Sequence, residues 1–422
     1  MEKYELKNNL NLYYYPINSA QSISIDLFVK VGSRNEDISN NGITHMLEHM
    51  HFRQLGTMNQ EEIYFKMEQM GNTLQATTYK ELLRFYVKTR HKNLMNCLEY
   101  FKQIITSYNW SQEQFEAEKK VVLNQILMRD SYFNIDKYVS ELLWNGDSLG
   151  FPIEGTKEVI EKLTLEELLE FKRRYFNPDN IFIVISGCIN INDIEYINDL
   201  FSQIKLTSEK KIIKTICPNY KTSKIAFMKN NEKYFDVNIS FIVDYELASI
   251  EEIIILSSIL GGGDGAILCM ELREKLGITS NIYSDITTYS DIAVFEITLN
   301  IYKENLLKGL TEIFYALNKS KTKIVEKDMD INIPFYTDNL WYWLENPCEL
   351  NLRMAWEIIT KKNPALSVEQ KISIYKNVTK ERLMCASKEI FKPENVFVAI
   401  AGAVGKLTKK EIKNIIRLLD QK

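Results

Sequence analysis

Two segments of this 422-residue chain repeat each other about half a chain length apart, and this repeat constrains the fold more than any other feature. Residues 174–187 read RYFNPDNIFIVISG, and residues 389–402 read EIFKPENVFVAIAG. Both place an aromatic and a polar residue before Pro, an acid and Asn, and then run through β-branched and aromatic residues to Gly. A second pair at nearly the same offset, SISIDLFVKVGS from Ser22 and DVNISFIVDYEL from Asp236, alternates like half-buried strands. The chain is therefore predicted to be a tandem duplication.

Each half has the same predicted order of elements. A strand and a helix come first, then strands within residues 73–89 or 281–301, then long helices and a final strand at 181–186 or 396–401. The segments LMNCLEYFKQII, EAEKKVVLNQILM and LEELLEFKRRYF carry apolar residues three and four apart, which indicates amphipathic helices. We predict an α+β fold of two homologous domains, each a mostly antiparallel sheet with helices on one face. Their predicted bounds are residues 1–210 and 220–422, joined through the polar stretch 208–224.

Composition and charge exclude several classes of function. The formal charge is −4 and the basic residues are scattered, so we expect no nucleic-acid partner. No stretch approaches the roughly 18 uncharged apolar residues of a membrane span. The first residues, MEKYELKNNLNLYYYP, do not resemble a signal peptide. Six widely spaced cysteines without a C-x-x-C pattern indicate thiols in a reducing compartment. We therefore expect a cytoplasmic protein.

Three of the four histidines fall within NNGITHMLEHMHF, residues 40–52. On a helix, His45 and His49 are four residues apart and project from one face, where both imidazoles can reach a Zn²⁺ ion at ~2.0–2.1 Å. Glu48 lies on the same side and can take a proton from a metal-activated water and return it to a leaving amine. The alternative is an ordinary amphipathic helix whose Met and Leu residues face the core and whose histidines are merely polar.

His45-x-x-Glu48-His49 has the inverted order of the common zinc-protease motif, and here the chain resembles the pitrilysin-like zinc peptidases, which include insulin-degrading enzymes and mitochondrial processing peptidases. The resemblance runs in order over nearly the whole chain. It is carried by VKVGSRNEDISNNGITHMLEHM (residues 29–50), MGNTLQATTYKE (residues 70–81), EAEKKVVLNQI (from Glu116) and LGGGDGAILCMELREKLG (residues 260–277). It implies a duplicated α+β architecture and a Zn²⁺ cofactor. We expect the helix of His45 to correspond to the helix just after the triple glycine.

The third metal position departs from the family pattern. The resemblance implies a glutamate ligand 76 residues after the second motif histidine, and Gln125 stands there. Glu118, two helical turns earlier, corresponds to the family's supporting acid. A glutamine offers a neutral carbonyl, so two imidazoles and an amide leave the metal's charge uncompensated and should bind it more weakly. Glu118 could relieve this through water or through a hydrogen bond to Gln125. The substitution agrees with a functional site that binds the metal weakly, and equally with a site that has lost its function.

A second departure lies in the other half. The resemblance implies an Arg and a Tyr seven residues apart that hold the substrate carbonyl. Arg273 fits the first position, but Ser280 replaces the Tyr, and Tyr283 is predicted to point to the opposite face of its strand. The alternative for Arg273 is a surface charge on its helix. A motif helix combined with an incomplete Arg/Tyr pair resembles one subunit of the family's short heterodimers.

Together these observations predict a zinc metalloendopeptidase subunit that cleaves peptides, with precursor or leader peptides as the substrate class implied by the resemblance. His45, His49 and Gln125 are the predicted metal positions, Glu48 and Glu118 the catalytic pair, and Arg273 the substrate-binding residue. We expect a paralogous subunit as partner, or a second copy in a homodimer. The alternative is a non-catalytic family member with a degraded zinc site that acts as a structural or docking subunit.

Overall fold

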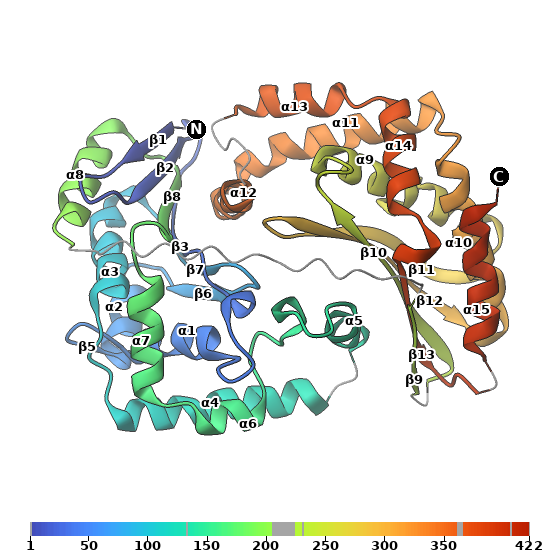
Figure 1. Ribbon diagram of the computed structural model, residues 1–422. Helices are drawn as coiled ribbons and strands as arrows, with labels where there is room; N and C mark the ends of the chain where they lie inside the picture. Colours follow the sequence, from blue (N-terminus) through green and yellow to red (C-terminus); the bar gives the residue numbers. More distant parts are fainter. Residues whose placement is uncertain are drawn as a thin grey trace. The chain divides into compact units, whose positions relative to one another are not determined.

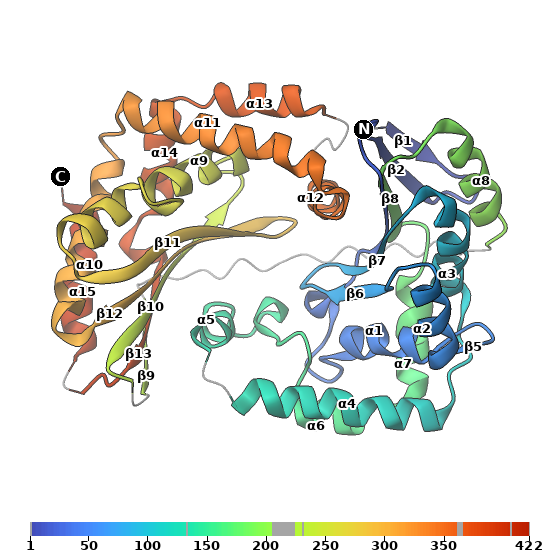
Figure 2. The same cartoon turned by 180° about the vertical axis from the view of Figure 1, so that it is seen from behind.

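The computed structural model describes residues 2–131, 134–204, 224–229, 232–360, 366–405 and 407–421, which form two compact units (Figures 1 and 2). Unit 1 comprises Met1–Phe133, Trp144–Thr215 and Tyr342–Ser367, and unit 2 comprises Asn134–Leu143, Ile216–Trp341 and Val368–Lys422. Two segments are thus exchanged relative to the sequence-based bounds 1–210 and 220–422. The predicted joining stretch, residues 208–224, lies outside the described residues except for Lys224.

Unit 1 is built on a six-stranded sheet with the order β1-β2-β8-β3-β7-β6. Strands β2 and β8 are parallel, and every other neighbouring pair is antiparallel. β6 forms one edge of this sheet. The strands are β1 (Glu2–Glu5), β2 (Asn11–Pro16), β3 (Ile23–Val29), β6 (Gln75–Thr78), β7 (Leu83–Thr89) and β8 (Ile181–Gly187), beside a small hairpin of β4 (Gln54–Leu55) and β5 (Met58–Asn59).

The helices of unit 1 bury apolar faces whose periodicity is visible in the sequence. Ile25 and Leu27 of β3 share one core with Met46 and Leu47 of the motif helix, which is the two-residue alternation of side chains along a strand. The helices are α1 (Ile43–Arg53), α2 (Gln60–Gln69), α3 (Leu94–Thr106), α4 (Gln112–Ser131), α6 (Lys157–Lys162), α7 (Leu165–Tyr175), α8 (Ile191–Ser202) and α12 (Pro347–Ile359).

Unit 2 has a five-stranded sheet with the order β11-β12-β10-β13-β9, in which β13 and β9 are parallel and the other pairs are antiparallel. Its strands are β9 (Lys224–Lys229), β10 (Tyr234–Asp244), β11 (Thr279–Thr288), β12 (Ile292–Tyr302) and β13 (Val396–Gly402). Its helices are α5 (Ile135–Leu143), α9 (Ile250–Gly261), a π-helix (Cys269–Lys275), α10 (Leu306–Ser320), α11 (Glu326–Tyr342), α13 (Val368–Lys376), α14 (Lys380–Ile390) and α15 (Lys409–Ile416).

The two sheets have the same strand order and the same strand directions. Read from β9, unit 2 runs β9-β13-β10-β12-β11, which matches β2-β8-β3-β7-β6 of unit 1 strand for strand, including the one parallel pair. The repeated segments of the sequence form β8 and β13, and the second pair forms β3 and β10. The α+β fold of two homologous halves is therefore confirmed.

One correspondence predicted from the sequence was wrong. In the common strand order, α1 follows β3 and α9 follows β10, so the counterpart of the motif helix is α9. The triple glycine, residues 261–263, ends α9 and therefore follows the counterpart helix. The prediction failed because a glycine run gives no sign of whether the helix precedes or follows it.

A helix also covers the second face of the sheet in unit 1, where the sequence predicted helices on one face. Phe28 and Phe182 point away from the α1 side and form a separate core with Leu350 and Met354 of α12. In unit 2, α5 contacts β10 and β13. Because α12 and α5 come from the opposite halves of the sequence, the exchange is reciprocal. Among the described helices, none is both long and apolar enough to span a bilayer.

Candidate metal centre

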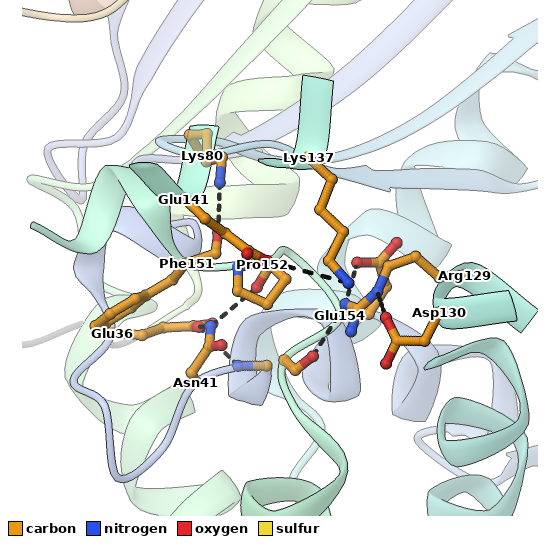
Figure 3. A network of polar contacts seen from close by, with 12 residues as sticks. Glu36, Asn41, Lys80, Arg129, Asp130, Lys137, Glu141, Phe151, Pro152 and Glu154 are labelled. Atoms are coloured by element: carbon orange, nitrogen blue, oxygen red, sulfur yellow. Dashed lines mark hydrogen bonds and ion pairs between the residues drawn. The ribbon is translucent and has the colours of Figure 1, made fainter. Parts of the chain in front are cut away.

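The motif helix α1 begins at Ile43, and its first amides are bonded to a buried carboxylate from outside the helix. Glu36 accepts hydrogen bonds from the backbone N–H groups of Gly42 (2.7 Å) and Thr44 (2.9 Å). Asn41 donates to the same carboxylate at 2.8 Å (Figure 3). Burial raises the pKa of Glu36, although these hydrogen bonds oppose the shift. A carboxylate at this end offsets the helix dipole and fixes the start of α1.

His45 and His49 lie side by side on α1, as their spacing predicts. Their ring centroids are 4.6 Å apart, with an interplanar angle of 66°. Burial, followed by the neighbouring His49, lowers the pKa of His45 to about 4. Its imidazole is therefore neutral at neutral pH. The buried Nδ1 of His45 has no hydrogen-bond partner within the described part of the chain, so no hydrogen bond fixes this ring from that side.

The imidazole of His49 is oriented by a carboxylate from another helix. Nδ1 of His49 lies 2.6 Å from Oε1 of Glu118 on α4. Arg53, one turn further along α1, donates from Nε to the other oxygen of Glu118. Burial raises the pKa of Glu118, but the hydrogen bonds from His49 and Arg53 outweigh it and lower that pKa below its usual value. An ionised Glu118 places the proton on Nδ1 and leaves the lone pair of His49 on Nε2, the arrangement common in metal-binding histidines.

Glu48 is held against the edge of the sheet. The hydroxyl of Thr78 on β6 donates to its carboxylate. Burial raises the pKa of Glu48, while the bonds from Thr78 and the nearby His49 oppose the shift. A carboxylate whose pKa is moved towards neutrality is suited to accept and return a proton. Thr78 therefore holds the carboxylate of Glu48 in place, and the role of Glu48 as a general base stays a prediction.

Gln125 lies two turns after Glu118 on α4, and α4 packs against α1. Its side chain is exposed. Within the described ranges, no group of three His, Cys, Asp or Glu side chains is placed to hold a metal ion. The adjacent imidazoles of His45 and His49 fit two positions of a zinc site, and the neutral Gln125 amide or water would have to supply a third donor. The role of Gln125 stays a prediction.

Arg273 and Tyr283 of unit 2 line one cavity of about 410 Å³ with Cys269 and Asp264. Arg273 is bonded to Asp264 at 2.9 Å. An extra residue is inserted in β11 where Thr279 and Asn281 pair with consecutive residues of β12, and the predicted direction of Tyr283 stays a prediction. A β-bulge of this kind resets the alternation of side chains along the strand.

The sequence analysis did not identify three residues that contact or support the candidate site. Arg53 is one helical turn after His49, a spacing that could have identified it. Thr78 and Glu36 carry no local signal, because their roles depend on the contacts of β6 and of the loop before α1. The remaining motif histidine, His51, is buried, and its ring nitrogens face the carbonyl oxygens of Leu47 and Ile104, so it belongs to the core.

A duplicated α+β fold that carries two imidazoles and a carboxylate on the helix after the third strand defines a class of proteins related to zinc peptidases. The chain belongs to the insulinase family, peptidase family M16. The family model described as "Insulinase (Peptidase family M16)" matches residues 15–157, and the model described as "Peptidase M16 inactive domain" matches residues 162–332.

Named relatives and a solved structure agree with this assignment. An uncharacterized zinc protease of Rickettsia felis is 27% identical over 332 residues, which cover 77% of this chain and 79% of that protein. The zinc protease PqqE of Helicobacter pylori is 26% identical over 350 residues, 78% of this chain and 77% of that protein. The crystal structure of a protease from Helicobacter pylori matches with a TM-score of 0.84 at 23% identity, over 95% of this chain and 98% of that one.

Proposed function

We propose that this chain is the subunit of a zinc-dependent metalloendopeptidase that carries the metal-binding helix. The observation that carries the proposal is the hydrogen bond from His49 to Glu118. It orients one of two adjacent imidazoles with its lone pair on Nε2, beside a base, Glu48, that Thr78 holds in place. A helix whose histidines were merely polar would have no need of a buried carboxylate to fix one ring.

In the proposed mechanism, each residue has one task. A zinc ion held by His45 and His49, with Gln125 as a neutral donor, would lower the pKa of a water molecule and polarise the scissile carbonyl. Glu48 takes the proton of the attacking water and delivers it to the leaving amine. The hydrogen bond from Thr78 keeps the carboxylate of Glu48 directed at one position, and Glu118 keeps His49 in the required tautomer.

The proposed substrate is an extended peptide, with precursor or leader peptides as the class. β6 is an edge strand whose backbone can pair with such a peptide. In unit 2, Arg273 and Tyr283 face one cavity and are proposed to hold the carbonyl of a substrate. If so, Tyr283→Phe raises KM by several-fold and Ser280→Ala does not, because Ser280 lines a different cavity. Equal effects of the two variants would remove Tyr283 from the proposal.

The proposed assembly is a pair of subunits acting in the cytosol. The expected partner is a paralogous chain, and a second copy of this chain is the other arrangement. Peptidase subunits of this kind occur among the matched proteins: the beta subunit of the mitochondrial-processing peptidase of Dictyostelium discoideum is 27% identical over 198 residues.

The decisive test is cleavage of a candidate precursor peptide with and without a partner chain. We expect chelator-sensitive cleavage, lost in Glu48→Gln while zinc affinity stays within about threefold, because Glu48 moves protons and is not a ligand. Glu61→Gln removes the same charge from an exposed position on α2 and is the matched control. Cleavage that survives Glu48→Gln contradicts the mechanism.

The second candidate is a non-catalytic docking subunit. It is favoured by the neutral Gln125 at the predicted third metal position. The same experiment separates the two candidates. Absence of chelator-sensitive cleavage with every partner tested, including a second copy of this chain, would support the docking role.

A further inference from the structure

The turn between β6 and β7, residues 79–82, immediately follows the residue that holds Glu48. Thr78, the last residue of β6, donates a hydrogen bond to the carboxylate of Glu48. The next residue, Tyr79, donates from its backbone N–H to the carbonyl oxygen of Leu82 at 2.7 Å and so closes the turn. Within its sheet, β6 is paired only with β7. The position of Thr78 therefore depends on the contacts that hold this turn.

The loop before α1 holds the main chain of the turn. A Cβ on Gly32 would lie 2.2 Å from the carbonyl oxygen of Tyr79, so the two main chains are in close contact. The backbone N–H of Arg34 donates to the carbonyl oxygen of Lys80 at 2.8 Å. Nζ of Lys80 in turn donates to the carbonyl oxygen of Phe151 (Figure 3). These contacts fix the backbone of the turn but not the ring of Tyr79.

The ring of Tyr79 packs against α12, a helix from the other half of the sequence. The ring centroids of Tyr79 and Trp356 are 5.6 Å apart, with an interplanar angle of 79°. This edge-to-face arrangement is a favourable one for aromatic rings. Both side chains also adjoin the core that α12 forms with Phe28 and Phe182 on the second face of the sheet. The turn after Thr78 is thus held by α12 as well as by the loop before α1.

α12 is itself anchored to the central strands of this sheet. The buried side chain of Asn351 donates from Nδ2 to the carbonyl oxygens of Ser24 on β3 (3.1 Å) and Val184 on β8 (3.2 Å). Arg84 of β7 donates to the carbonyl oxygen of Cys348 in the first turn of α12, at 2.8 Å. Because these bonds reach three adjacent strands, α12 presents a fixed surface to the turn.

We propose that Trp356 is a positioning residue for Glu48 and acts through Tyr79 and Thr78. The inference rests on the proposed role of Glu48 as the general base. One aromatic contact, one peptide bond and one hydrogen bond connect Trp356 to the carboxylate of Glu48. Proton transfer requires a base in the correct position, and a small displacement of that base lowers the rate of the chemical step. α12 thereby links the second half of the sequence to the general base of unit 1.

The kinetic test uses the full chain in the cleavage assay. Trp356→Ala should lower kcat about tenfold and leave KM within about twofold, because it moves the base and not the substrate. Trp356→Phe keeps an aromatic ring against Tyr79, and its kcat should stay within about threefold of wild type. Trp343→Ala is the size-matched control, since the ring of Trp343 packs 3.7 Å from the guanidinium of Arg353 on the same helix. Equal losses of kcat in Trp343→Ala and Trp356→Ala would overturn the inference.

A double-variant cycle tests the route through Thr78. If Trp356 acts on Glu48 through Thr78, then Trp356→Ala should lower kcat by less than about twofold once Thr78→Val has already removed the hydrogen bond. A further tenfold loss in the double variant would show that Trp356 acts by another route. Thermal melting shows whether Trp356→Ala is folded. If it is not, Tyr79→Leu carries the test, because it removes the same contact from the other side.

Amide hydrogen exchange of residues 75–82 gives a measurement that does not depend on activity. In Trp356→Ala this segment should exchange about tenfold faster than in wild type, because the turn has lost a support. In Trp343→Ala it should exchange as in wild type. Unchanged exchange in Trp356→Ala overturns this inference alone. Absence of chelator-sensitive cleavage by the wild-type chain with every partner contradicts the proposed function, and with it any role of Trp356 in catalysis.

Discussion

α1 and α9 occupy corresponding places in the two units, and each is tied by hydrogen bonds to an edge strand and to a long helix. In unit 1, these ties use titratable groups. Glu48 accepts a hydrogen bond from Thr78 of β6, and the next residue, His49, is bonded to Glu118 of α4. Both ties therefore hold side chains that can move protons or bind a metal.

In unit 2, the same two ties are made by groups that do not titrate. Ser257 of α9 is bonded to Ser284 of β11 at 3.0 Å, and the next residue, Ser258, to Asn332 of α11 at 2.9 Å. In both halves this helix is hydrogen-bonded to the edge strand and to the long helix, so these two contacts belong to the fold. The chemistry depends on which side chains make the two contacts.

The largest expected effect comes from giving α1 the residue of α9. His49→Ser removes one of two imidazoles, so zinc affinity should fall by more than the roughly 10–100-fold that follows loss of a ligand's hydrogen-bond partner. Ser258→Ala in unit 2 should leave zinc affinity unchanged. Competition with a chelator measures both. Equal zinc affinities of the two variants would show that the motif helix is not the metal site.

Glu118 and Asn332 provide the second contrast. Glu118→Gln keeps the shape of the side chain but loses the charge that fixes the tautomer of His49, so zinc affinity should fall by roughly 10–100-fold. Asn332→Ala should have no effect on zinc. A change of less than twofold in Glu118→Gln would mean that the bond to His49 does not orient a ligand.

Gln125→Glu should act in the opposite direction. A carboxylate in place of the amide adds a hard anionic donor, and we expect zinc to bind about tenfold more tightly or better. Asn124→Asp adds the same charge at the neighbouring exposed position of α4 and is the control. If both variants tighten zinc equally, the effect is long-range and Gln125 does not contact the metal.

The smallest expected effect concerns the hydrogen bonds from α1 to β6 and from α9 to β11. Thr78→Val removes one hydrogen bond and Ser284→Ala removes two, and each lost bond should lower the free energy of unfolding by about 1 kcal/mol in chemical denaturation. Of the two, Thr78→Val should also lower kcat, because Thr78 positions Glu48. A loss of kcat in Ser284→Ala as large as in Thr78→Val would contradict the claim that the contact in unit 1 positions Glu48 and the contact in unit 2 is only structural.

Local sequence pattern was enough to predict the strands and the pairing of site residues on one helix. The repeats around Asn177 and Lys392 located β8 and β13 because alternation and a preceding Pro are local properties. The four-residue spacing of His45 and His49 likewise determined their proximity.

Features that depend on tertiary contacts could not be predicted. The bulge near Ser280 has no residue signature, so counting positions along the strand could not decide the direction of Tyr283. The exchange of α12 and α5 was missed because an amphipathic helix does not reveal which sheet it covers. The bond between Arg129 and Glu154 joins residues 25 positions apart in sequence, brought together by a loop.

The most direct test of the account is an anomalous difference map from zinc-soaked crystals of the wild-type chain. The account predicts one peak at ~2.0–2.1 Å from a ring nitrogen of His45 and from Nε2 of His49. Gln125 should be the nearest side chain of α4. A map without density between the two imidazoles, or a metal held elsewhere in the chain, would contradict it.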